Sequence, residues 1–283
     1  PLLPRQRPLY WGRWYLTGRS GADTGRVGLG SGRGRVRLGA PTDQGSGTTS
    51  CLNADHLRVE QLACHQVSSE AQDKTHRQRL AAALERAEAL LFDLDGTLID
   101  SSGSTRRAWS AFAVRHGLDP EEVVESVQGQ PSRESVRRLA PDVDPVFEQG
   151  LVEQAELADT EGIVALPGAL AALNSDKKVA IVTSCTDALA AVRIGAAGLP
   201  RPEVVITADR VSNGKPDPEA FLLGAHELGV NPSDCIVFED APAGIAAGKA
   251  AGALVVGLRT THSVDSLSEA DLLVDDLSEL SAD

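Results

Sequence analysis

The sequence predicts an α/β protein built on a parallel sheet with helices on both faces. From residue 167 onward, apolar segments of strand length alternate with segments of helical spacing, which is typical of strands joined by crossover helices. The apolar run that begins at Ala89 is continuous, as in a strand buried on both faces. Hydrophobic residues make up 42% of the chain but aromatic residues only 4%, so we expect an aliphatic core, which favours the same class.

Residues 1–85 differ from the rest in composition and charge. They contain 12 Lys+Arg and 7 Asp+Glu, whereas residues 86–283 contain 15 and 33. Residues 1–50 hold eleven glycines and eight arginines without a period of 2 or 3.6, which predicts disorder. From Glu70 to Glu88, apolar residues recur at helical intervals, which predicts a helix. We therefore expect a disordered or non-native leader over residues 1–85 that ends in a helix.

Two interpretations of this leader stay open. An RNA-binding arm would stack Trp11, Trp14 and Tyr15 on bases, but the basic residues are few and lie apart from these rings. The chain contains no methionine, so a leader that arose from a misplaced start codon or from cloning explains the segment at least as well.

Residues 102–166 show helical spacing, and we expect no strand among them. Apolar residues three and four apart, separated by Gly and Pro, predict four helices. These helices are Thr105–His116, Pro120–Val127, Ser132–Leu139 and Val143–Asp159. An insert directly after the first strand could close over the carboxyl end of that strand as a lid.

The rest of the chain predicts alternating helices and strands. The expected helices are Ala169–Asn174, Asp187–Ala197, Asp217–Leu228 and Pro242–Ala251. The expected strands after the first one, Ala89–Asp93, are Val179–Thr183, Glu203–Thr207, Cys235–Glu239, Leu254–Gly257 and Asp271–Val274. The sequence therefore divides into the leader, a core (86–101 and 167–283) and the helical insert (102–166).

Polar side chains follow several of these strands. Asp93 and Asp95 are two residues apart at a strand end, so they point to the same side and repel each other unless a cation lies between them. Thr183-Ser184 and Glu239-Asp240 end two further strands, and Lys215 lies in the loop after another. The carboxyl ends of parallel strands meet at one edge of a sheet, so these groups should form one site.

This combination predicts phosphoryl chemistry with Mg²⁺, which prefers oxygen ligands. Asp93 is the candidate nucleophile, and Asp95 the candidate acid and base. Thr183, Ser184 and Lys215 would bind the phosphate. Taken singly, each group has a plainer explanation: a strand-end turn, a solvated lysine or a helix cap. Their joint occurrence at successive strand ends favours the site.

Four motifs resemble those of the haloacid dehalogenase superfamily. They are Asp93-Leu-Asp95-Gly-Thr97, Thr183-Ser184, Gly214-Lys215-Pro216-Asp217 and Glu239-Asp240-Ala-Pro-Ala-Gly244. The helical insert is similar to the small helical cap of that superfamily, and further segments resemble its bacterial sugar and hexitol phosphatases. The resemblance implies a Rossmann-like core and magnesium-dependent dephosphorylation of sugar or sugar-alcohol phosphates through an aspartyl phosphate. It also implies that Asp93, the backbone carbonyl of Asp95 and Asp240 bind the metal.

The substrate is less well specified. The insert carries Gln128-Gly129 where such phosphatases often have His-Gly, and Arg133 is a candidate sugar contact in the same loop. A sugar phosphomutase of the β-phosphoglucomutase type is the near alternative, because it has the same cap and motifs. A non-catalytic binding protein is the alternative from another class, although no motif residue is missing.

Composition also bounds partners and location. No apolar run reaches the ~18 residues of a membrane helix, and the acidic residues 86–283 argue against nucleic acid as a partner. The four cysteines Cys51, Cys64, Cys185 and Cys235 are too widely spaced for a zinc motif or a disulfide framework. We expect a cytoplasmic protein, monomeric in the simplest case, whose partner is a small phosphorylated metabolite.

Overall fold

The computed structural model describes residues 75–127 and 132–281, all of which belong to one compact unit, His56–Asp283. Residues 1–50, for which the sequence predicts disorder, lie outside the described residues, as does the Gln128-Gly129 loop. The described chain begins with a helix at 75–86. Among the described helices, none is long and apolar enough to cross a membrane.

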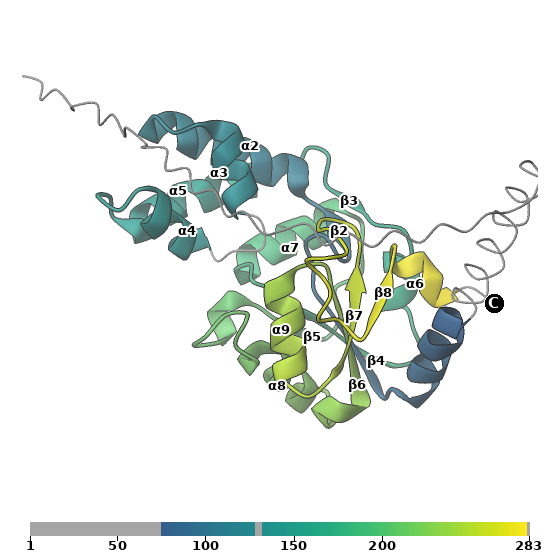
Figure 1. Cartoon of the computed structure of the whole chain (residues 1–283). Helices are drawn as coiled ribbons and strands as arrows, with labels where there is room; N and C mark the ends of the chain where they lie inside the picture. Colours follow the sequence, from purple (N-terminus) through teal and green to yellow (C-terminus); the bar gives the residue numbers. More distant parts are fainter. Residues whose placement is uncertain (1–74, 128–131, 282–283) are drawn as a thin grey trace, which may run out of the picture. The chain divides into compact units, whose positions relative to one another are not determined.

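A six-stranded parallel sheet forms the core of the described chain, in the order β5-β4-β1-β6-β7-β8 (Figure 1). The strands are β1 Ala89–Phe92, β4 Lys178–Val182, β5 Val204–Ile206, β6 Cys235–Glu239, β7 Leu254–Leu258 and β8 Leu272–Val274. Strand β1 is central, and Phe92 lies opposite Ile181 of β4 and Phe238 of β6. The predicted parallel α/β class is confirmed.

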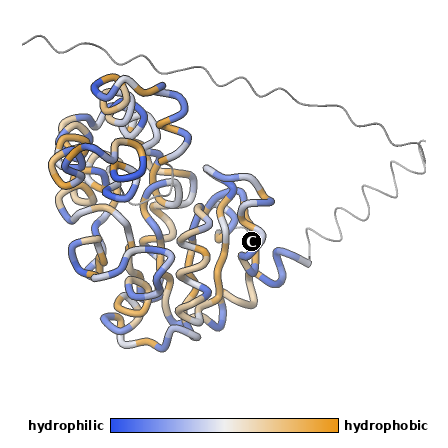
Figure 2. The backbone as a smooth tube through the Cα atoms, turned by 60° about the vertical axis from the view of Figure 1, so that its left-hand side comes forward, coloured by the Kyte–Doolittle hydropathy of each residue, from blue (hydrophilic) through white to orange (hydrophobic). Residues whose placement is uncertain are grey.

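Helices cover both faces of this sheet because successive strand residues point to opposite sides. Leu90 and Phe92 pack in one hydrophobic cluster with the helix at 75–86, α6 Ala169–Leu173 and α7 Asp187–Ala196. The alternate strand residues Ala89 and Leu91 pack in a second cluster with α8 Glu219–Glu227 and α9 Pro242–Ala250. Figure 2 shows orange, hydrophobic segments running through the middle of the described chain.

Short 3₁₀ helices complete the core between these elements. They are η1 Ala208–Arg210, η2 Pro232–Asp234 and η3 Leu277–Ser281. Helix α8 begins at Glu219, two residues later than predicted, because Pro218 occupies the N-cap position and the Asp217 carboxylate accepts from the Glu219 N–H. The sequence-predicted boundaries of the six strands of this sheet and of helices α6, α7 and α9 differ from the observed ones by at most one residue.

The described part of the insert contains four helices, which are α2 Ser102–His116, α3 Pro120–Val127, α4 Ser132–Leu139 and α5 Pro145–Ala158. They enclose a hydrophobic cluster of their own around Trp109 and Phe112, separate from the two clusters of the sheet. The bounds of α3 and α4 are those predicted from the spacing of apolar residues.

The expectation that no strand lies between residues 102 and 166 is wrong at one place. β2, Ile99–Asp100, pairs antiparallel with β3, Val164–Ala165, so that the chain segments entering and leaving the insert form a two-stranded ribbon. Two residues are too few to show a period of 2, and their pairing depends on two segments about 65 residues apart. Sequence spacing therefore could not predict this ribbon.

Candidate active site

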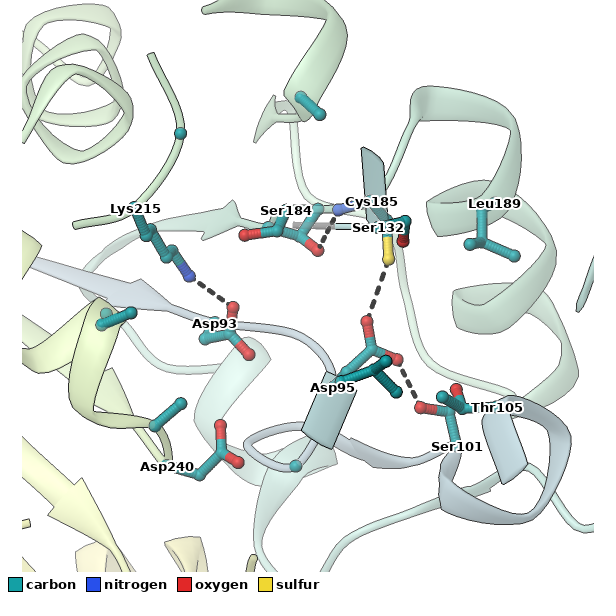
Figure 3. A pocket seen from close by; sticks show the side chains of 18 of the residues that line it. Asp93, Asp95, Ser101, Thr105, Ser132, Ser184, Cys185, Leu189, Lys215 and Asp240 are labelled. Carbon is teal, nitrogen blue, oxygen red and sulfur yellow. Dashed lines mark hydrogen bonds and ion pairs between the residues drawn. The ribbon is translucent and has the colours of Figure 1, made fainter. Parts of the chain in front are cut away.

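The predicted site residues meet at the carboxyl edge of the sheet (Figure 3). Asp93 follows β1, Thr183 follows β4, and Asp240 follows β6, while Lys215 lies in the loop between η1 and α8. Together with Asp95 and Ser184 they line a pocket of about 1300 Å³ that also takes in residues of the insert. The structure thus brings together all the site residues that sequence reasoning took from the core.

Lys215 is the centre of the buried part of this site. Its Nζ donates to Asp93 Oδ1 at 2.5 Å, to Glu239 Oε1 at 2.6 Å and to the carbonyl of Val182 at 3.0 Å. Burial opposes the charged amine, but the two carboxylates outweigh that cost and raise the pKa of Lys215. The lysine is therefore a fixed positive charge next to the candidate nucleophile.

Three carboxylates lie close together at this amine, and two of them contact it. Asp93, Glu239 and Asp240 each offer an oxygen, and these oxygens lie within 4.8 Å of one another. Burial raises the pKa of Asp93 well above its usual value, against the pull of Lys215 and with repulsion from Glu239 and Asp240. Burial, followed by repulsion from Glu239, raises the pKa of Asp240 to about 7. One ammonium group cannot balance three carboxylates, and their oxygen atoms are the ligands that a hard divalent cation prefers.

Both carboxylate oxygens of Glu239 already have hydrogen-bond donors within the protein. Its side chain is 1% exposed, with Oε1 on Lys215 and Oε2 accepting the N–H of Ala241 at 3.1 Å. Asp240 is held from the other side, because Thr97 and Thr261 both donate to its carboxylate. Asp93 and Asp240 are therefore the carboxylates best placed to hold a metal.

Asp95 turns away from the cluster, as Figure 3 shows. Its Oδ1 accepts from the Ser101 hydroxyl at 2.5 Å, and its Oδ2 accepts from the Cys185 thiol at 3.0 Å. Arg193 Nη1 also lies 3.0 Å from Asp95 Oδ2. The side chain thus takes no part in the acidic cluster, and the contribution of its backbone carbonyl to a metal site stays a prediction.

Two glycines let this site close up. Gly96, between Asp95 and Thr97, has a φ of +87°, and a Cβ there would lie 2.2 Å from Asp240 Oδ2. A Cβ on Gly244, in the first turn of α9, would lie 1.7 Å from Glu239 Oε1. Both acidic side chains therefore occupy space that only a glycine leaves free.

The predicted phosphate-binding residues at the end of β4 both line the pocket. Thr183 is buried and its hydroxyl oxygen accepts the N–H of Cys185 at 3.1 Å, whereas Ser184 is exposed. The insert contributes a mainly polar wall to the same pocket. Arg133 is exposed there and its Nε donates to Gln149 Oε1 at 3.0 Å.

Sequence reasoning missed two further residues of the site. Thr261 follows β7, so the strand-end argument applied to that strand would have indicated it. Arg193 lies in helix α7, whose residues between Asp187 and Arg193 are all apolar, and it is buried against Asp95 and Glu156. A lone arginine in such a helix was the available signal.

The parallel sheet, the acidic cluster with a buried lysine at its carboxyl edge and the helical insert beside the pocket define an α/β protein with a candidate metal-dependent site. A model of the haloacid dehalogenase-like hydrolases matches residues 87–252, and the chain belongs to this family. The predicted superfamily is thereby confirmed.

Known relatives agree with this assignment. Hexitol phosphatase A of Escherichia coli is 45% identical over 202 residues, which cover 69% of this chain and 94% of that protein. Validoxylamine A 7'-phosphate phosphatase of Streptomyces hygroscopicus subsp. limoneus is 40% identical, with coverage of 67% and 94%. The structure of β-phosphoglucomutase from Clostridium difficile superposes with a TM-score of 0.61 at 27% identity, covering 69% and 93%. The predicted enzyme class, a hydrolase of phosphoric monoesters, is confirmed by the family and the phosphatase relatives.

Proposed function

We propose that this chain is a magnesium-dependent phosphatase that hydrolyses small sugar or sugar-alcohol phosphates. The observation that carries the proposal is the buried contact between Lys215 and Asp93 inside a cluster of three carboxylates. A fixed cation beside a nucleophilic carboxylate neutralises charge on a phosphoryl group, which is the main requirement of its transfer. The names of the hexitol and validoxylamine phosphate phosphatases support the substrate class.

Asp93 attacks phosphorus in the first step. A bond forms between a carboxylate oxygen and phosphorus, the bond from phosphorus to the sugar oxygen breaks, and that oxygen takes the proton of Asp95. The products are the free sugar or polyol and an aspartyl phosphate on Asp93. Lys215, Thr183 and Ser184 bind the phosphoryl oxygens during this transfer.

Water completes the reaction in the second step. It attacks phosphorus and gives its proton to Asp95, while the bond between phosphorus and Asp93 breaks. Inorganic phosphate leaves, and both aspartates return to their starting states. Asp93, Asp240 and the backbone carbonyl of Asp95 would hold Mg²⁺, which supplies further positive charge for the phosphoryl oxygens.

We also propose a division of labour along the chain. Residues 86–101 and 167–283 form the catalytic core, and residues 102–166 form the cap. Arg133 of the cap contacts the sugar portion of the substrate, because its side chain lines the same pocket as Asp93. The partner of the protein is accordingly a small phosphorylated metabolite.

A panel of phosphorylated metabolites tests the proposal. Phosphate release should be fastest with hexose, pentose or hexitol phosphates and should require Mg²⁺, so that EDTA abolishes it. A panel that includes these compounds and gives no release with Mg²⁺ contradicts the proposal.

A sugar phosphomutase is the second candidate, favoured by the structural match to β-phosphoglucomutase. Incubation with glucose 1-phosphate and a bisphosphate primer separates the two activities. A mutase forms the 6-phosphate with little free phosphate, whereas a phosphatase releases free phosphate.

A further inference from the structure

Arg193 joins the core to the cap through two carboxylates, the half-buried Asp95 and the buried Glu156. It lies on α7 of the core and is 4% exposed. Its Nη1 is 3.0 Å from Asp95 Oδ2, and its Nη2 is 2.9 Å from Oε1 of Glu156, a residue of α5 in the cap. Glu156 is 5% exposed, so this carboxylate is shielded from water as well. One guanidinium thus compensates a catalytic carboxylate on one side and a cap carboxylate on the other.

Neutral groups complete the same network. On the cap side, Nη2 of Arg193 also donates to the Thr105 hydroxyl of α2 at 3.0 Å. On the core side, Nη1 lies 3.1 Å from the sulfur of Cys185, whose thiol donates to Asp95. The Ser101 hydroxyl, next to α2, holds the other Asp95 oxygen. Both oxygens of Asp95 are therefore fixed, one of them through Arg193.

We propose that Arg193 is a positioning residue that sets the orientation of Asp95 according to the place of the cap. The guanidinium is planar, so Nη1 can remain on Asp95 while Nη2 bonds the cap only when Glu156 and Thr105 lie in one place. A displaced cap would remove those bonds and free Arg193 to turn. This inference rests on the proposed function, because it assumes that Asp95 gives its proton to the leaving oxygen.

The leaving group of the substrate reveals the role of Arg193. When the phosphorus–oxygen bond to a polyol breaks, the alkoxide needs the proton of Asp95, whereas dinitrophenolate leaves as a stable anion without one. The value of kcat/KM reports only the steps up to the departure of this group. A defect in the position of Asp95 should therefore lower kcat/KM for a hexitol phosphate and spare kcat/KM for dinitrophenyl phosphate.

The test compares Arg193→Met with Asp95→Asn on both substrates. We expect Arg193→Met to lower kcat/KM for the hexitol phosphate about 100-fold and to change kcat/KM for dinitrophenyl phosphate less than about threefold. Asp95→Asn should give the same selective pattern. Arg193→Lys keeps the charge but lacks the fork, so it should recover only part of the lost rate.

Two further variants separate positioning from folding. Arg193→Met leaves the Glu156 carboxylate buried without its cation, so the double variant Arg193→Met/Glu156→Gln removes the uncompensated charge and should unfold at a higher urea concentration than Arg193→Met. Its selective loss of hexitol phosphate hydrolysis should persist. Glu156→Gln alone weakens only the cap side, so it should lower the same kcat/KM about tenfold. Arg201→Met is the control. It removes an exposed ion pair with Asp187, the first residue of α7, and should leave kcat/KM unchanged for both substrates.

The outcomes are distinct. An equal loss on both substrates in the double variant, or full hexitol phosphate activity in Arg193→Met, overturns the positioning role and leaves the proposed function standing. A wild-type enzyme that hydrolyses neither substrate with Mg²⁺ overturns the proposed function itself.

Discussion

Lys215 Nζ lies 2.5 Å from Asp93 Oδ1, and both side chains are buried at the carboxyl edge of the sheet. The contact joins two residues that are 122 positions apart in the sequence. It also places a permanent cation where negative charge gathers during phosphoryl transfer.

Replacement of Lys215 by methionine should impair both stability and catalysis. The substitution leaves Asp93 and Glu239 buried without their cation, which should lower the free energy of unfolding by about 3–5 kcal/mol. Urea unfolding measures this loss, and kcat/KM for a hexitol phosphate should fall about 100-fold or more. Lys249→Met is the matched control, because Lys249 pairs with Asp271 at the surface and should cost less than about 1 kcal/mol. Equal effects of the two substitutions would contradict the account.

The metal-free protein should lose stability as the pH rises towards neutrality. Burial raises the pKa of Asp240 to about 7 from 3.8. Below pH 3.8 folded and unfolded states both carry the proton, whereas between 3.8 and 7 only the folded state retains it. The free energy of unfolding therefore falls by a total on the order of 4 kcal/mol through this pH window. Above the window it levels off.

Urea unfolding in EDTA, at intervals from pH 4 to pH 8, measures this decline. Asp240→Asn removes the titrating group, so its curve should be flatter than that of the wild type. Saturating Mg²⁺ should also flatten the wild-type curve, because the cation favours the ionised carboxylates. Parallel wild-type and Asp240→Asn curves in EDTA would show that Asp240 keeps its ordinary acidity.

Replacement of Arg133 should change the binding of the sugar portion of the substrate more than the rate of phosphoryl transfer. Its side chain is exposed in the pocket wall and bonded only to Gln149 among the described residues, so Arg133→Gln should not destabilise the fold. KM for the preferred sugar phosphate should rise about tenfold, while kcat/KM for dinitrophenyl phosphate should change little. Exposed Arg138, on the same helix, bonds the Ser126 carbonyl and is a suitable control. An unchanged KM would remove Arg133 from the substrate contacts.

Gly244→Ala should damage the site from within a helix. The new Cβ would lie 1.7 Å from Glu239 Oε1, so the glutamate must move and release Lys215. We expect a loss of about 1–3 kcal/mol in the free energy of unfolding, together with reduced activity. Gly195→Ala, in α7, meets nothing within 4 Å and should instead stabilise the protein by about 0.5–1 kcal/mol. A stabilised Gly244→Ala variant is the contrary result.

Much of this architecture is accessible from the sequence because it depends on local pattern. Asp93, Thr183 and Asp240 follow strongly apolar strands, and parallel pairing brings the ends of such strands to one edge. Helices α3 and α4 were bounded correctly because apolar spacing and flanking glycine or proline residues mark their ends.

The rest depends on contacts between distant segments. Whether Asp95 faces a metal or an arginine is decided by α7 and by the cap, and no local pattern in Asp93-Leu-Asp95 encodes it. Arg193 has the spacing of an ordinary helix residue, and its partner Glu156 belongs to a different part of the fold. Likewise, the sequence shows Glu239 only as an acidic residue at the end of a strand, and its bond to Lys215 is visible only in the structure.

The most direct test of the central claim is phosphate release by Asp93→Asn. Asparagine preserves the size of the side chain but is a poor nucleophile, so release from a hexitol phosphate at saturating Mg²⁺ should fall at least about 1000-fold. Urea unfolding should confirm that the variant is folded. A folded Asp93→Asn enzyme that releases phosphate at a rate within about tenfold of the wild type would contradict the assignment of Asp93 as the nucleophile.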